Sequence, residues 1–128
     1  MGLALCATGF DKTLHIGYGG FSIFRSYIAK AYSEKHGEMY SKLIQLFGGI
    51  EDDFEEKWNK DNDESLDLLL FHSDCDGVLR PKEARALYLA LTKLTVDFDE
   101  DPFYTEFYKD FLTLLQHSYK RRVIIYFC

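Results

Sequence analysis

The sequence lacks any apolar run close to the roughly 20 residues that cross a bilayer, which argues against a membrane-spanning helix. It has only two prolines and three cysteines among 128 residues, and no repeat or low-complexity tract. Cys6, Cys75 and Cys128 do not form the even, spaced set of a disulfide framework, so we expect free thiols in a reducing cytoplasm. No basic segment followed by an apolar stretch opens the chain, and a secretory signal is therefore not expected.

Acidic residues outnumber basic ones, 21 to 15, which gives a formal net charge of −6. General nucleic-acid binding needs a basic surface and is not expected. Residues 51–67 hold nine acids and residues 97–110 hold six, whereas the remaining 97 residues have a net charge of +6. The acidic stretches are either solvated loops and helix starts or a sign that a small anion binds elsewhere. The bases that could hold such an anion are Arg25, Lys30, Arg80 and the run Lys120–Arg122.

Apolar residues make up 47 % of the chain, which is typical of a folded protein with a core. A length of 128 residues suits one domain, so we expect a single domain over 1–128. Within it, residues 51–67 are either an acidic insertion or an acidic helix. Phe54 and Trp58 lie four positions apart, which favours a helix with one docked face.

Apolar spacing predicts strands at both ends of the chain and helices between them. Leu3–Thr8 and Leu14–Tyr18 are typical of strands around a turn, and Val123–Phe127 of a closing strand. The helices expected from spacing are Phe21 to about Lys35 with its end marked near Gly37, Met39–Phe47, Ser65–Phe71, one beginning at Pro81 and one after Pro102. The fold class is therefore predicted to be α+β, with about five helices packed on a small sheet formed by the N-terminal strands and the C-terminal strand.

Residues 72–83 match the spacing of a twelve-residue calcium loop. Asp74 and Asp76 occupy its third and fifth positions. Gly77 falls where that loop turns sharply, and Glu83 falls at the position of the bidentate carboxylate. Ca²⁺ is the one cofactor that this spacing suggests.

Two residues of the same segment disagree with a calcium site. His72 stands at the first position, where Ca²⁺ prefers an oxygen ligand, and Arg80 adds a positive charge. The alternative is a tight turn in which Asp74 or Asp76 accepts backbone N–H groups. Glu83 would then stabilise the first turn of the following helix.

Three short motifs occur in order along the first two-thirds of the chain. They are Met1-Gly2-Leu3, then Tyr18-Gly19-Gly20-Phe21-Ser22-Ile23-Phe24-Arg25, then Ser73-Asp74-Cys75-Asp76-Gly77. In this order they resemble a family of uncharacterised small proteins of bacteria and their phages, which carry Tyr-x-Gly-Phe-x-x-(Phe or Trp)-Arg and Ser-Asp-Cys-(Asp or Glu)-Gly. Members often have an aspartate after Met-Gly-Leu, where this chain has Ala4, so any role of that acid is absent here. The resemblance locates a site more than it names an activity.

The two longer motifs are interpreted as one ligand site. Residues 17–20 allow close backbone approach at a strand-to-helix junction, where free N–H groups favour an anion. Arg25 offers a planar fork to phosphate or carboxylate, and Tyr18 could stack on a ring. Asp74 and Asp76 could accept hydrogen bonds from ribose hydroxyls or a base amino group, or else form a structural ion pair with Arg25. The predicted ligand-binding residues are Tyr18, Gly19, Gly20, Phe21, Arg25, His72, Ser73, Asp74 and Asp76.

The leading functional hypothesis is a non-enzymatic protein that binds a small anionic, nucleotide-like ligand. The phage association of the family implies an anti-defence sponge that sequesters a nucleotide-derived immune signal in the host cytoplasm. Such sponges are often oligomers, and the aromatic-rich segment Phe103–Tyr119 could form a contact between copies. The alternatives are a calcium-binding module with metal at Asp74, Asp76 and Glu83, and a nucleotide hydrolase with His72 as base. An interaction protein that uses residues 51–67 against a basic partner also stays open.

Overall fold

The computed structural model describes residues 2–45, 54–72 and 77–128. In these ranges the chain forms six helices and four strands, and no helix in them is long and apolar enough to cross a membrane. In chain order the elements are β1 (Gly2–Ala7), β2 (Leu14–Gly17), α1 (Tyr18–Tyr32), α2 (Glu34–Gln45), α3 (Phe54–Asn59), α4 (Glu64–Leu70), β3 (Val78–Leu79), α5 (Pro81–Thr92), α6 (Pro102–Arg121) and β4 (Ile125–Phe127).

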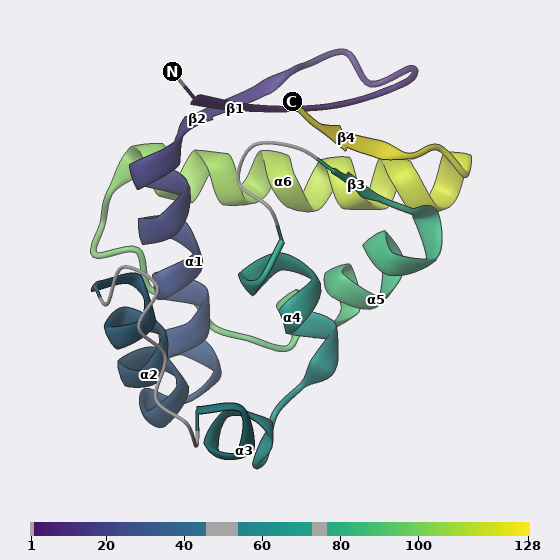
Figure 1. Cartoon of the computed structure of the whole chain (residues 1–128). Coiled ribbons are helices and arrows are strands. Elements are labelled where there is room, and N and C mark those ends of the chain that lie inside the picture. The colour runs from purple at the N-terminus through teal and green to yellow at the C-terminus, as the bar shows by residue number, and fades with distance from the viewer. Residues whose placement is uncertain (1, 46–53, 73–76) are drawn as a thin grey trace.

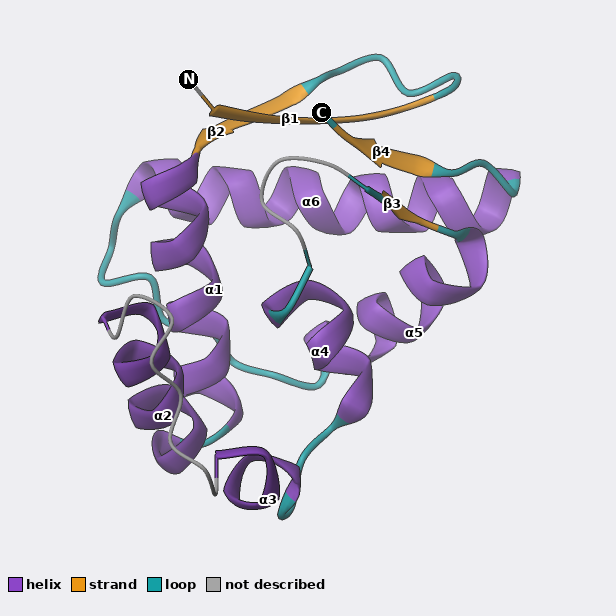
Figure 2. Cartoon of the chain, in the orientation of Figure 1, coloured by secondary structure: helices purple, strands orange, loops and turns teal. Residues whose placement is uncertain are grey.

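The strands form one antiparallel sheet in the order β2-β1-β4-β3, and the helices lie on one side of it (Figure 1). Figure 2 separates the orange strands from the purple helices below them, with α6 directly under the sheet. The register pairs Leu5 of β1 with Leu14 on one side and with Phe127 on the other. The predicted α+β class and the sheet built from both ends of the chain are confirmed. The short strand β3 was not predicted, because two residues carry no periodic signal.

Phe24 of α1 lies at the centre of the core. Its ring is fully buried, stacks on Phe98 at 5.8 Å and meets the edges of Phe107 at 4.9 Å and Phe111 at 6.0 Å. These partners come from α6 and from the segment just before it, so α1 and the C-terminal third of the chain share one packed cluster. The other large, fully buried side chains are Phe21, Phe111, Leu3, Leu5, Ile28, Leu66, Leu69, Leu79, Leu87, Leu91 and Leu114.

The break between the first two helices differs from the prediction. Ser33 is extended and ends α1 four residues before Gly37, which was expected to mark the end of the helix. Gly37 instead lies inside α2, where an added Cβ would be 2.8 Å from the Cα of Lys30. The glycine therefore allows two helix backbones to approach closely, which explains why it does not end a helix here.

Residues 54–59 of the acidic stretch form the docked helix α3, as the spacing of Phe54 and Trp58 predicted. The Trp58 ring is 3 % exposed and contacts the ring of His36 at 4.8 Å. The Nε2 atom of His36 lies 2.8 Å from the Trp58 carbonyl oxygen, and the Trp58 indole N–H donates to Asp67. These contacts attach the short helix to both α2 and α4.

Candidate functional site

Arg25 projects from α1 to the end of α4, where the last carbonyl groups have no N–H of a following helical turn to accept from. Its Nη1 atom donates to the carbonyl oxygens of His72 at 2.8 Å, Leu70 at 3.3 Å and Leu69 at 3.4 Å. The guanidinium also lies 4.3 Å from the centre of the Phe21 ring. Arg25 is 8 % exposed and Phe21 is fully buried. The structure thus places Arg25 of the first long motif against the end of α4 and against His72, just before the second motif, and it buries the cation that was expected to face a ligand.

His72, two residues after the end of α4, contacts the sheet. Its ring stacks on Phe127 of β4 with centroids 3.8 Å apart, and its Nε2 atom lies 3.0 Å from the Val78 carbonyl oxygen. Gly77 faces the same ring, because an added Cβ would be 3.0 Å from the Cε1 atom of His72. His72 is therefore held between α4, β3 and β4.

Several features of residues 72–83 can be compared with a calcium loop. Gly77 has φ +106°, the kind of left-handed conformation that the turn of such a loop requires. Leu79 is buried in β3, and α5 begins at Pro81 with Glu83 in its first turn. The Glu83 carboxylate accepts the Arg80 backbone N–H at 3.0 Å. The predicted residues Ser73, Asp74 and Asp76 lie outside the described residues, and among the described ones no three metal-binding side chains lie together.

At the start of α1 there is open space beside Gly17 and Gly19, two of the glycines that were expected to receive an anion. Gly17 is the N-cap and contributes no side-chain cap, and the first turn carries no acid. An added Cβ at Gly19 would meet nothing within 4 Å. The Tyr104 hydroxyl lies beside Gly20, and burial followed by the charge of Asp101 raises the pKa of that tyrosine. The junction is open, but a carboxylate that disfavours anions lies on the α6 side of it.

A groove between α1 and α2 was not predicted from the sequence. It has a volume of about 590 Å³. Its walls include Ile23, Tyr27 and Lys30 from α1 and Glu34, Glu38 and Lys42 from α2. The small side chains of Ser26 and Ser41 also line it and take up little of the space between the helices. We call this feature the α1–α2 groove.

Tyr27 gives this groove a fixed aromatic wall. Its ring packs on Phe98 at 5.3 Å and on Tyr104 at 5.7 Å, and its hydroxyl donates to Asp99 at 3.2 Å. Burial raises the pKa of Tyr27, and the hydrogen bond to Asp99 and the charge of that carboxylate raise it further. The phenol therefore stays protonated and in place. Ile23, which is 49 % exposed, adds an apolar surface to the same groove.

The groove carries two basic and two acidic side chains. Lys30 and Lys42 are exposed and belong to different helices. Among the described residues, neither lysine forms an ion pair. Both ammonium groups are therefore available to an anion, while Glu34 and Glu38 can accept hydrogen bonds from donors on the same molecule.

Of the residues in this groove, only Lys30 was considered from the sequence, as one of several bases that could hold an anion. The periodic pattern placed the others on a solvated helix face. Ile23 is the residue that could have indicated the groove from the sequence. Ile23, Tyr27 and Lys30 follow one another at about one helical turn, so an isoleucine there interrupts an otherwise polar helix face.

No protein-family model, curated protein or solved structure matches this chain. The resemblance of the three motifs to small bacterial and phage proteins stays a prediction.

Proposed function

We propose that the chain is a non-enzymatic protein that binds a small molecule, and that the α1–α2 groove receives it. The observation that carries the proposal is a groove of about 590 Å³ with an ordered aromatic wall and two uncommitted lysines. Ligand sites usually occupy 300 to 1,000 Å³ and combine apolar walls with a few polar groups, roughly as this groove does.

Two other basic side chains support this choice because each already has partners within the fold. Arg25 is buried against backbone carbonyl groups. A second hollow of about 580 Å³ beside β2 and α6 contains Lys12, but that lysine pairs with Asp110 at 3.1 Å, and Glu106 adds a further acid. An anion therefore meets more available positive charge in the α1–α2 groove than in either of these places.

The groove chemistry suits a nucleotide-like ligand. A base or another flat ring can pack on Tyr27 and Ile23, and a phosphate can bind Lys30 and Lys42. Glu34 and Glu38 can accept hydrogen bonds from sugar hydroxyls or an amino group. Sequestration of a nucleotide-derived immune signal by a phage protein is the biological role that we propose for such binding.

We predict that Lys30→Gln and Lys42→Gln each raise the Kd for a nucleotide probe about tenfold. Each change removes a charge-assisted hydrogen bond worth about 1.4 kcal/mol at the groove. Native mass spectrometry against cyclic dinucleotides, cyclic mononucleotides and ADP-ribose identifies the probe that binds, and calorimetric titration then measures its Kd.

Lys109→Gln is the matched control, because Lys109 is an exposed lysine on α6, away from the groove. It should leave the Kd unchanged. Equal affinity in all three variants would contradict the proposal, as would the absence of binding by every probe. Recovery of a chemically altered probe after denaturation would instead favour the hydrolase hypothesis.

Calcium binding at residues 72–83 is a second candidate function. The observation that favours it is the backbone around the loop: Gly77 has positive φ, and α5 begins so that Glu83 falls in its first turn. His72 and the Val78 carbonyl oxygen, the ligand positions one and seven, approach to 3.0 Å. Because a carbonyl oxygen only accepts, the His72 Nε2 carries the proton in this contact, and calcium binding would have to break that hydrogen bond.

For this candidate we predict a calcium-dependent gain in stability that Glu83→Gln removes. An ion at about 100 times its Kd raises the free energy of unfolding by about 2.7 kcal/mol. Glutamine can still accept the Arg80 N–H, so the helix start is preserved while the bidentate carboxylate is lost. Differential scanning calorimetry with calcium and with EDTA measures the effect.

Glu34→Gln provides the control, since Glu34 is also an acid in the first turn of a helix. This variant should respond to calcium as the unmodified chain does. A Tm that does not change with calcium in the unmodified chain would refute the calcium candidate and leave the tight-turn interpretation of the loop.

A further inference from the structure

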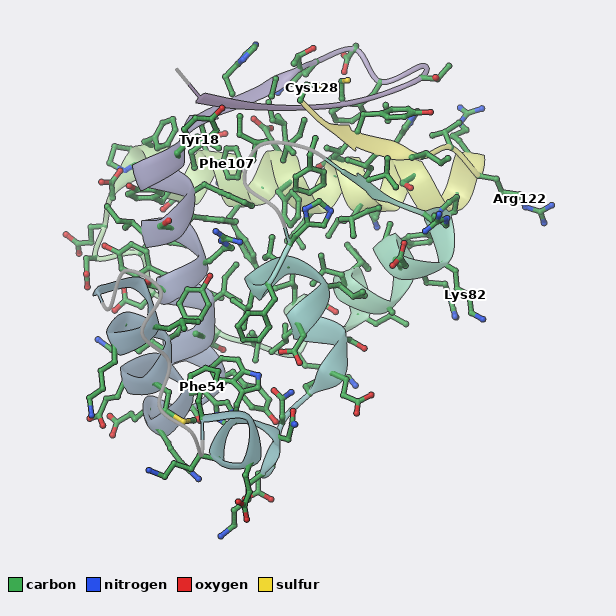
Figure 3. All side chains as sticks on the ribbon, viewed as in Figure 1. Tyr18, Phe54, Lys82, Phe107, Arg122 and Cys128 are labelled. Atoms are coloured by element: carbon green, nitrogen blue, oxygen red, sulfur yellow. The ribbon has the colours of Figure 1, made fainter. Side chains whose placement is uncertain are left out.

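The sheet face turned away from the helices carries two free thiols. Along β1 the burial alternates, so Leu3 and Leu5 face the core while Ala4 and Cys6 lie on the outer face. Cys6 is half-buried, and Cys128, which follows β4, is exposed (Figure 3). Neither cysteine is in a disulfide.

The strand register places these cysteines next to each other. Cys6 pairs with Tyr126, and Ala4 exchanges two backbone hydrogen bonds with Cys128, of 3.1 and 2.9 Å. Residues two positions apart on a strand share a face, so Cys6 and Cys128 are diagonal neighbours on the outer face. The sheet therefore brings together two thiols that are more than 120 residues apart in the sequence.

The electrostatic behaviour of Cys6 agrees with a direct contact between the side chains. Its pKa is raised first by burial and then by Cys128, through both charge repulsion and a side-chain hydrogen bond between the two thiols. Cys6 therefore retains its proton at neutral pH, and the exposed Cys128 is the thiol that an oxidant meets first.

We propose that Cys6 and Cys128 form a redox-modification site that glutathione disulfide converts into a cross-strand disulfide. The Cys128 thiolate attacks one sulfur of glutathione disulfide, forms a mixed disulfide and releases one glutathione thiolate. Cys6 then loses its proton and attacks the Cys128 sulfur, which releases the second glutathione. Two protein thiols are oxidised and one glutathione disulfide is reduced to two glutathione molecules.

The backbone near Cys128 can make the adjustment that this bond needs. Diagonal neighbours on antiparallel strands have Cα atoms about 7 to 8 Å apart, whereas a disulfide usually spans 4.4 to 6.8 Å. β4 ends at Phe127, and the backbone of Cys128 is joined to β1 by its two hydrogen bonds with Ala4. A shift of Cys128 that breaks these two hydrogen bonds closes the gap and leaves the pairs Leu5–Phe127 and Cys6–Tyr126 in place.

The test compares the unmodified chain with Cys75→Ser, Cys6→Ser and Cys128→Ser in defined mixtures of reduced and oxidised glutathione. Peptide mapping by mass spectrometry, without reduction, identifies each disulfide. In the unmodified chain and in Cys75→Ser we expect a disulfide joining residues 6 and 128. In Cys6→Ser we expect one glutathionyl group on Cys128, lost at least tenfold more slowly than in the chain that retains Cys6.

Three outcomes would overturn the proposal. The first is separate glutathionyl groups on Cys6 and Cys128 in Cys75→Ser at equilibrium. The second is a disulfide that includes Cys75 in the unmodified chain in place of the bond between residues 6 and 128. The third is full reduction of both thiols in a mixture that oxidises ordinary exposed dithiols. Circular dichroism of each variant verifies that the fold is retained, so that loss of the bond is not a result of unfolding.

Discussion

Replacing Arg25 by methionine should lower the free energy of unfolding by about 3 kcal/mol, since hydrogen bonds to a charged group contribute about 1.5 to 3 kcal/mol. The methionine retains much of the apolar volume but cannot donate to the carbonyl oxygens of Leu69, Leu70 and His72. The Tyr40 hydroxyl still donates to the Leu70 carbonyl oxygen at 2.7 Å and the His72 backbone N–H to that of Leu69 at 3.2 Å, so the His72 carbonyl oxygen loses its short bond of 2.8 Å. Equilibrium denaturation in urea measures the loss.

Arg85→Met is the matched control, because Arg85 is an exposed arginine on α5 and its replacement should change stability by about 0.5 kcal/mol or less. Hydrogen exchange gives a second, local measurement. In Arg25→Met the amides at the end of α4 should exchange faster than the rest of the core. Equal unfolding midpoints for the two variants would show that the bonds from Arg25 do not stabilise the fold.

Phe24→Ala has the other large expected effect, a loss of about 4 kcal/mol in the free energy of unfolding. The change removes a fully buried ring and leaves a cavity among Phe98, Phe107 and Phe111. Those rings belong to α6 and to the segment just before it, far from Phe24 in the sequence. A local movement of α1 therefore cannot fill the space. Thermal and urea denaturation both measure the loss.

Phe103→Ala separates this cavity effect from the general effect of losing an aromatic ring on a helix. Phe103 is 51 % exposed on α6, and its removal should cost about 1 kcal/mol or less. Where Phe24→Ala does not fold, Phe24→Leu fills part of the cavity and should fall between the two. A Phe24→Leu variant as stable as the unmodified chain would contradict the central role of this ring.

The arrangement of strands and helices was largely predictable because it depends on local patterns. The two prolines stand at the starts of α5 and α6, as expected for a residue that suits the first helical turn. The end of α1 was not predictable in this way. Ser33 ends the helix through its extended backbone, and its hydroxyl accepts the His36 N–H at 2.9 Å. Gly37 was therefore less informative than a serine that caps the second helix.

Two features of the candidate site, the orientation of Arg25 and the shape of the α1–α2 groove, could not be predicted from the motifs. The sequence predicted one site from Arg25 and residues 73–77, of which residues 73–76 lie outside the described ones. It could not show whether the guanidinium faces solvent or backbone, because that depends on how α4 packs against α1. The α1–α2 groove depends on the same kind of information. Its shape follows from the close approach at Gly37, a contact between helices that no spacing of residues reveals.

The pairing of β1 with β4 also has a consequence for how the chain folds. The turn between β1 and β2 is short, but the contact between Leu5 and Phe127 closes a loop of more than 120 residues. By chain-closure entropy alone, the longer loop costs about 2 kcal/mol more than the hairpin. During synthesis, β1 therefore has only β2 as a partner until residues 125–127 leave the ribosome. Its second edge stays open to other strands while residues 18–124 are synthesised, a period in which protection by a chaperone would matter most.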